Sequence, residues 1–164
     1  MAVQDAMRAM KTADVAVLVI DAGERMLRKQ ELSIADAVLQ EGRSIVVAAN
    51  KMDLVVNNDE SNYDEYYPQE EFTQAVRTQL EECFPMLRKT PVIAMSALHK
   101  DTSVDELMPV VFRARDRWAQ TITTGQLNRW LTEALHLEPV PSVSGKRAKI
   151  KYVLQTKGRP PTFL

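Results

Sequence analysis

The chain has 164 residues, of which 45% are hydrophobic and 26% are charged, and its formal net charge is -1. This composition excludes a disordered chain and provides for one full domain or two incomplete ones. The longest apolar run, Val15–Ile20, is too short to span a bilayer, and Met1 is not followed by the basic stretch and apolar core of a secretory signal. We therefore expect an intracellular protein with no membrane partner, either cytoplasmic or, in a eukaryote, organellar.

Three short apolar runs predict strands that are buried on both faces. In chain order they are Val15–Ile20, Ser44–Ala49 and Pro91–Met95. Helical periodicity follows each of them, over about residues 28–40, 70–83 and 103–118. This alternation predicts an open parallel sheet with helices on its faces, in which ligands bind at the carboxyl ends of the strands. Those ends are Asp21, Asn50 and Ser96.

Two of the predicted helices carry apolar stripes that indicate which side faces the core. The stripe of the helix over 70–83 consists of Phe72, Val76, Leu80 and Cys83. We expect Cys83, the single cysteine, to be a packing residue, because it has no Cys or His companion at metal-ligand spacing. The helix over 103–118 begins with the capping-box pattern of Ser103 and Glu106. Its predicted core residues are Val104, Leu107, Met108 and Val111, with Trp118 as a further candidate.

The composition changes after about Gln120. A helix is predicted over about Thr124–Leu135, and prolines then interrupt the chain. Residues 148–154 alternate between polar and apolar side chains and predict a strand with one face in water. One helix and one strand cannot bury a core, so we expect residues 121–164 to be the start of a longer second domain.

The small net charge conceals an uneven distribution of charge along the chain. No Asp or Glu follows Glu138, whereas six cations do: Lys146, Arg147, Lys149, Lys151, Lys157 and Arg159. A basic segment of this kind is either a solvated face or a surface that contacts RNA phosphates. Acidic residues gather between Asp59 and Glu71, where hydrophobic periodicity is weak, so we expect a solvated loop there.

Asn50, Lys51 and Asp53 follow the second predicted strand directly, in the pattern Asn-Lys-x-Asp. The pattern suits recognition of guanine, because the Asp53 carboxylate can accept two hydrogen bonds at once from the N1–H and N2–H2 groups of the base. Adenine lacks that pair of donors. The aliphatic stem of Lys51 can lie over the base plane, and Asn50 can tie neighbouring loops together and contact the purine edge. A strand end that leads into an ordinary polar turn is the alternative interpretation of this motif.

A second motif ends the third predicted strand, one strand–helix unit later. We expect the backbone N–H of Ala97 to point at the guanine O6, which would reject the amino group that adenine carries there. A Ser-Ala pair alone predicts nothing, but after Asn-Lys-x-Asp it is the expected partner. The candidate base-binding residues are therefore Asn50, Lys51, Asp53, Ser96, Ala97 and Leu98.

Together the motifs resemble those of translation-factor-type GTPases, and more narrowly those of the Der (EngA) family. The segments that carry the resemblance are 13–22, Asn50–Asp53, Ser96–Leu98, Leu127–Asn128, 145–152 and 159–163. Members of this family are double-G-domain GTPases of large-subunit ribosome assembly. The resemblance implies the later half of the second G domain over 1–120 and the start of a KH-like domain over 121–164. The implied fold class is α/β: a partial P-loop-type G domain of three parallel strands with flanking helices, then the start of an α+β KH-like domain.

Two motifs of that family are absent from this sequence. A phosphate loop needs the pattern G-x-x-x-x-G-K-[ST], and no two of the five glycines have that spacing. The D-x-x-G motif needs an Asp three residues before a glycine, and none of the five glycines has one. The resemblance therefore implies that GTP or GDP is contacted here through guanine only, with Mg2+ expected only in the complete domain. We expect Met1 to open a fragment, a partial gene model or a truncated paralogue, and the isolated chain not to hydrolyse GTP.

The leading hypothesis is a GTP-binding fragment of a ribosome-assembly GTPase whose basic segment contacts ribosomal RNA or the large ribosomal subunit. The second hypothesis is a non-enzymatic RNA- or ribosome-interaction module that retains a vestigial half G domain. A Rossmann-type enzyme is disfavoured, because no Gly-rich turn follows any of the three predicted strands.

Overall fold

The computed structural model describes residues 2–24, 26–56, 69–99, 104–143, 146–147 and 149–164. The chain divides into two compact units, Met1–Asp116 and Arg117–Leu164. Most of the acidic stretch that we expect to be a loop lies outside the described residues, as does Ser103 of the expected capping box. Within the described ranges, no helix is both long enough and apolar enough to cross a membrane.

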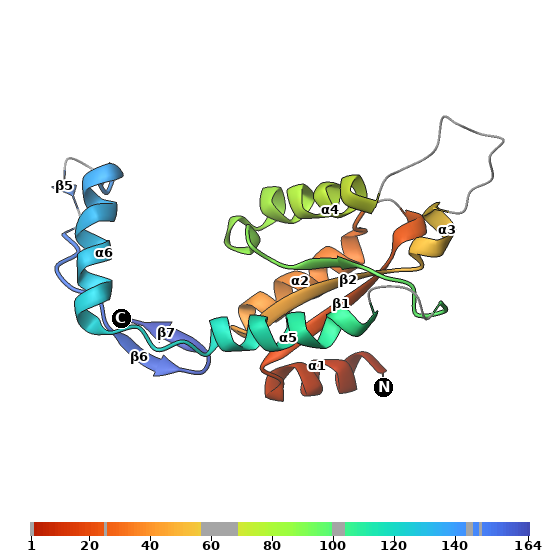
Figure 1. Cartoon of the computed structure of the whole chain (residues 1–164). Helices are drawn as coiled ribbons and strands as arrows, with labels where there is room; N and C mark the ends of the chain where they lie inside the picture. The colour runs from red at the N-terminus through yellow and green to blue at the C-terminus, as the bar shows by residue number, and fades with distance from the viewer. Residues whose placement is uncertain (1, 25, 57–68, 100–103, 144–145, 148) are drawn as a thin grey trace. The chain divides into compact units, whose positions relative to one another are not determined.

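A three-stranded parallel sheet forms the centre of the first unit (Figure 1). Its strands are β1 (Val15–Asp21), β2 (Ser44–Asn50) and β3 (Val92–Ala94), in the order β1-β2-β3. The register pairs Asp21 of β1 with Asn50 of β2, so the carboxyl ends of these two strands lie level. The predicted parallel sheet is therefore confirmed, whereas burial on both faces holds for β2 and β3 and is wrong for β1.

Helices connect the strands and cover the sheet. The α-helices of this unit are α1 (Ala2–Thr12), α2 (Lys29–Gln40), α3 (Met52–Val56), α4 (Gln69–Cys83) and α5 (Val104–Trp118), and the 3-10 helices are η1 (Ala22–Glu24) and η3 (Pro85–Leu87). The three helices predicted from periodicity, α2, α4 and α5, are confirmed. Helices α1 and α3 are not predicted from the sequence. The α1 segment does carry apolar residues at helical spacing, among them Ala6, Met7 and Met10, whereas α3 is too short to show a helical repeat.

The core lies on both faces of β2, whose residues Ile45–Ala49 are all buried. One face of the sheet packs against α2 and α4, and the fully buried side chains Phe72, Val76 and Leu80 of α4 belong to this cluster. Burying an apolar side chain of this size stabilises the fold by about 1.5–3 kcal/mol. The other face presents Val46 and Ile93 to Ala114 of α5. The sheet thus lies between helices, and β2 is held from both sides (Figure 1).

Two packing predictions for the helices are wrong. Cys83 is exposed at the end of α4, because Phe84 turns back against the core in its place. Val104 and Met108 of α5 are also exposed, since α5 meets the sheet through a neighbouring stripe at spacing i, i+3, i+4 and i+7. That stripe consists of Leu107, Val110, Val111 and Ala114.

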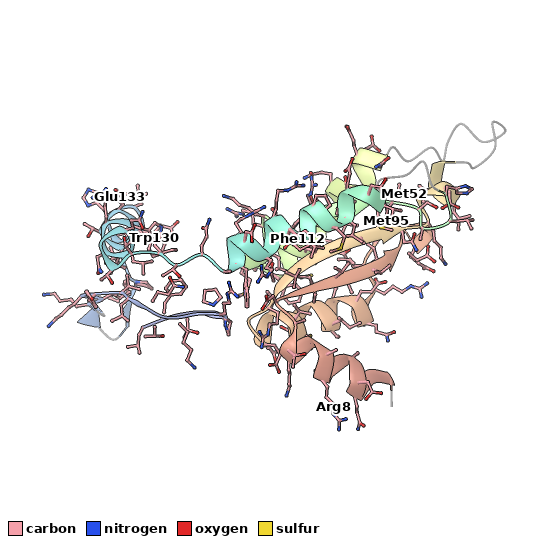
Figure 2. The ribbon with its side chains drawn as sticks, turned by 60° about the horizontal axis from the view of Figure 1, so that its bottom comes forward. Arg8, Met52, Met95, Phe112, Trp130 and Glu133 are labelled. Atoms are coloured by element: carbon pink, nitrogen blue, oxygen red, sulfur yellow. The ribbon has the colours of Figure 1, made fainter. Side chains whose placement is uncertain are left out.

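β1 is an edge strand of the sheet, and its two sides differ in burial. Leu18 and Ile20 are buried in the main core, whereas Val17 and Val19, which alternate with them, are 38% and 58% exposed. Phe112 of α5, labelled in Figure 2, is another exposed large apolar residue of this unit. The first unit therefore presents apolar side chains and an edge strand at its surface.

The second unit is built on α6 (Thr124–Leu137) and short antiparallel pairs. The strands β4 (Ser142–Val143) and β5 (Lys146–Arg147) form one pair, and β6 (Gln155–Gly158) and β7 (Pro161–Phe163) form the other. Thr123 caps α6 by accepting a hydrogen bond from the backbone N–H of Gln126, whose side chain in turn contacts the Thr123 backbone. The predicted helix at this place is confirmed.

The predicted strand over 148–154 is wrong for residues 149–154, which form no strand, and Ala148 lies outside the described residues. The physical reason is visible at Val153. Its backbone C=O accepts from Asn128 Nδ2 at 2.9 Å, and its N–H donates to Asn128 Oδ1 at 3.1 Å. A side chain of α6 thus takes the hydrogen bonds that a neighbouring strand would otherwise make.

Candidate functional site

The candidate site lies at the carboxyl ends of the three parallel strands. Asp21 and Asn50 are paired in the register, and the backbone N–H of Met95 donates to the C=O of Ala49 at 2.8 Å. This bond extends the pairing of β3 to the residue before Ser96. The sequence-based expectation that the three strand ends meet at one edge of the sheet is therefore confirmed, and the polar residues that follow the strands start from adjacent positions.

A tight turn connects β2 to α3 and contains the first motif. Lys51 has a φ of 65°, in the left-handed region that is costly for a residue other than glycine and that often marks a functional loop. Met52 is buried in the core, and its N–H donates to the C=O of Met95 at 3.2 Å. Figure 2 shows Met52 and Met95 close together at this end of the sheet. Burial of Met52 thus fixes the loop while Lys51 remains exposed.

Asp53 is oriented by the second motif. Its side chain is only 12% exposed, and the hydroxyl of the fully buried Ser96 donates a hydrogen bond to its Oδ1. Its other oxygen, Oδ2, lies 3.9 Å from Nε2 of the exposed His99. A carboxylate can accept about four hydrogen bonds in all, so Asp53 keeps acceptor capacity beyond the bond from Ser96.

Asn50 and Ala97 join the two motifs through a second hydrogen bond. The backbone N–H of Ala97 donates to Asn50 Oδ1 at 2.9 Å. The expected loop-tying role of Asn50 therefore corresponds to a contact in the structure, and it uses the same N–H that we expect to face the guanine O6. Leu98, the next residue, is 79% exposed and does not contribute to the core. Binding of a base would require Ala97 to share its N–H or to exchange partners.

Lys51 contacts the end of β1, a pairing that sequence reasoning does not predict. Its Nζ lies 2.6 Å from Asp21 Oδ2, and the backbone N–H of Gly23 donates to Asp21 Oδ1 at 3.0 Å. The hydrogen bond from Lys51, with that from Gly23 after it, holds the pKa of the Asp21 carboxyl below its ordinary value. The same contact with Asp21 raises the pKa of Lys51. The only signal for Asp21 in the sequence is its place at a predicted strand end.

Comparison with known proteins places this arrangement in a family. Residues 3–116 match the elongation factor Tu GTP-binding domain, and residues 121–164 match the KH-domain-like family of the C-terminal part of EngA bacterial GTPases. The chain belongs to the Der (EngA) GTPase family. The partial G domain and the KH-like segment that the resemblance implies are therefore both shown.

Curated Der relatives match this Der-family chain along its full length. GTPase Der of Rhodopseudomonas palustris (strain BisA53) is 37% identical over 164 residues, which are 100% of this chain and 33% of the relative. GTPase Der of Mesorhizobium japonicum is 38% identical over 164 residues, and these cover 32% of that protein. The chain thus spans about a third of the length of the curated relatives it matches.

Proposed function

We propose that this chain carries the guanine-recognising part of a GTPase that acts in biogenesis of the large ribosomal subunit. The observation that supports the proposal best is the Asp53 carboxylate, which the buried Ser96 orients at the joined ends of β2 and β3. In this proposal residues 1–120 belong to the G domain and residues 121–164 to the KH-like domain. The protein works in the bacterial cytoplasm or in an organelle.

Asp53 is proposed to bind the Watson–Crick edge of guanine. Ser96 occupies one hydrogen-bonding position on Oδ1, and the remaining positions of the carboxylate can accept the N1–H and N2–H2 donors. Both bonds end on one charged group. A base that lacks the two donors therefore binds less tightly, by more than the free energy of one neutral hydrogen bond. Asp53 is therefore the residue that selects guanine.

The other motif residues are proposed to hold the rest of the base. The stem of Lys51 covers one face of the ring, the exposed side chain of Leu98 lies near the other, and the Ala97 N–H meets O6. Asn50 accepts the same Ala97 N–H in the structure, and in this proposal Ala97 shares it between Asn50 and O6 when a base binds. These residues fit a guanine base, so GTP or GDP is the proposed cofactor. In the complete domain, phosphates and Mg2+ would be held by motifs that this sequence does not contain.

The experiment is a titration of the chain with GMP and with XMP, followed by NMR shifts of backbone amides. Base contacts alone are expected to give about millimolar affinity, which this method can measure. Asp53→Asn places an amide donor where guanine presents N2–H2, whereas xanthine presents a carbonyl there. We expect the unmodified chain to prefer GMP and Asp53→Asn to prefer XMP, a change of about three orders of magnitude in the ratio of the two affinities.

Asp36→Asn is the matched control. Asp36 lies on α2, outside the site, and accepts a hydrogen bond from Gln40 at 2.7 Å. This variant should keep the preference of the unmodified chain for GMP. If the ratio of GMP to XMP affinity is the same in both Asn variants, Asp53 does not read the base and the proposal fails.

The charge of the second unit favours an RNA-binding role as the second candidate function. Residues 117–164 contain eight Lys or Arg residues and two Glu residues, although the chain as a whole carries a formal net charge of -1. Such a surplus attracts the phosphates of ribosomal RNA and would release counterions on binding. In a non-enzymatic interaction module this binding would persist while GMP leaves the spectrum unchanged. Titration with RNA alongside GMP distinguishes the two functions.

A further inference from the structure

Asp21 is the acidic residue at the carboxyl end of β1, and it is not one of the base-binding residues that the sequence predicts. Its place in the register is opposite Asn50, so the next residue of the guanine motif, Lys51, lies within reach of its side chain. The Lys51 ammonium is 2.6 Å from Asp21 Oδ2. A neighbouring strand that carries no predicted base-binding residue therefore contacts the guanine motif through the Lys51 side chain.

The turn after β1 holds the Asp21 carboxylate in place. Oδ1 accepts the Gly23 N–H at 3.0 Å, which leaves Oδ2 directed at Lys51. A Cβ atom at Gly23 would lie 3.2 Å from Oδ1, closer than ordinary van der Waals contact. The absence of a side chain at Gly23 thus allows the backbone to approach the carboxylate, and both oxygens of Asp21 are engaged.

Lys51 is consequently held at both ends. Its backbone is fixed in the left-handed region by the turn into α3, and its ammonium is fixed by Asp21. A free lysine side chain samples many rotamers, and ordering it when a ligand binds lowers affinity. An ion pair that orders the stem beforehand reduces this loss.

We propose that Asp21 is a positioning residue for the base: it holds the Lys51 ammonium so that the aliphatic stem forms one wall of the guanine site. The inference rests on the proposed function of that site. The stem contacts the face of the ring, whereas Asp53 contacts its edge. Asp21 therefore sets the affinity for the base without setting the choice between guanine and xanthine.

The test is the titration with GMP and XMP applied to Asp21→Asn. We expect both affinities to fall by about three- to tenfold, the factor for ordering one long side chain, while their ratio stays that of the unmodified chain. Asp14→Asn is the matched control, because Asp14 pairs with Arg115 at 2.9 Å beside the opposite end of β1. The two carboxylates have almost equal exposure, 35% for Asp14 and 36% for Asp21.

A double-mutant cycle separates positioning from a general loss of structure. Lys51→Met keeps a long apolar stem but has no ammonium for Asp21 to hold. If Asp21 acts through Lys51, Asp21→Asn has no further effect on GMP affinity when Lys51→Met is already present. Gly23→Ala, which crowds the carboxylate without removing it, should weaken GMP binding in the same way and should also lose its effect beside Lys51→Met.

The possible outcomes are distinguishable. Equal GMP affinity of the unmodified chain and Asp21→Asn overturns the inference and leaves the proposed function intact. If Asp21→Asn lowers GMP affinity by the same factor with Lys51 present and with Lys51→Met, the inference is overturned as well, since the effect is then structural. If Asp21→Asn does not fold, the Gly23→Ala cycle decides by the same criterion. No response of the unmodified chain to GMP overturns the proposed function and this inference together.

Discussion

The buried hydroxyl of Ser96 donates a hydrogen bond to Oδ1 of Asp53, although the two residues are 43 positions apart in the sequence. Ser96 follows β3 and Asp53 lies in α3, so the contact exists only when β2 and β3 are paired and Met52 is buried. The orientation of the proposed base-reading carboxylate is therefore a product of the packed sheet and not of its own loop.

Removing this hydroxyl should weaken guanine binding. Ser96→Ala leaves Asp53 without its orienting donor, and a hydrogen bond to a charged group contributes about 1.5–3 kcal/mol. We expect GMP affinity to fall by roughly tenfold or more, measured by the same NMR titration. Ser33→Ala removes an exposed hydroxyl that bonds the C=O of Lys29 at 2.9 Å on α2, and it should bind GMP normally. Equal binding by both variants would show that Asp53 needs no support from Ser96.

Stability in acid should depend on Asp21. Its pKa is lowered from the ordinary value of 3.8, first by the hydrogen bond from Lys51 and then by that from Gly23. Because the folded-state pKa is the lower one, this contribution to stability is complete above the unfolded pKa and is lost as the pH falls through the folded pKa. Denaturant unfolding from about pH 6 down to about pH 2 should show Asp21→Asn less stable than the unmodified chain at the upper end, with the difference vanishing in acid. A difference that does not change with pH would contradict the sign of this shift.

The stability of the second unit should depend on the amide side chain of Asn128. Asn128→Ala leaves the N–H and C=O of Val153 without the partners they have in the structure, which should lower the free energy of unfolding of this unit by about 1–3 kcal/mol. Hydrogen exchange at the Val153 amide should accelerate accordingly. Thr132→Ala removes the hydrogen bond from an exposed hydroxyl to the C=O of Asn128, one turn along α6. It should change the free energy of unfolding by no more than a few tenths of a kcal/mol and leave exchange at Val153 slow. Slow exchange at Val153 in Asn128→Ala would refute this account.

The exposed side of β1 should cause association of the isolated chain. An edge strand with apolar side chains is a template for pairing with another chain, and Val19 is the most exposed apolar residue of β1. Sedimentation should therefore show concentration-dependent association that Val19→Lys reduces while the unfolding transition is retained. Leu18→Lys, its neighbour on the buried side, should abolish folding. A chain that stays monomeric at every concentration tested would rule out this role of the edge.

The basic segment of the second unit should bind single-stranded RNA through its phosphates. Charge reversal at Lys146, Arg147 and Lys149 should flatten the dependence of log affinity on log salt, by roughly 0.7 for each phosphate that the protein no longer neutralises. Reversal of the exposed cations Arg88 and Lys89 in the first unit provides the control, and it should leave the slope unchanged. Identical slopes for all three proteins would identify the segment as a solvated face.

Local patterns in the sequence predict the sheet and the two base-binding motifs, because buried strands and the residues that follow them are adjacent along the chain. Long-range partners are not encoded in this way. The pairing of Lys51 with Asp21 depends on the register of β1 and β2, and the wrong strand prediction at Val153 depends on Asn128 in another element. Helix α1 is a missed prediction of another kind, because its sequence places Ala6, Met7 and Met10 on one side at helical spacing.

The burial of β2 has a consequence for how the first unit opens. A strand that is paired on both sides and covered on both faces exchanges its amides last, since opening it requires the unfolding of the whole unit. The loop of Asn50 and Lys51 begins directly at its end. Fraying of α1, or of the exposed end of α4, can therefore occur many times while that loop keeps its shape. The first base-binding motif is therefore attached to the strand of the first unit that we expect to open last.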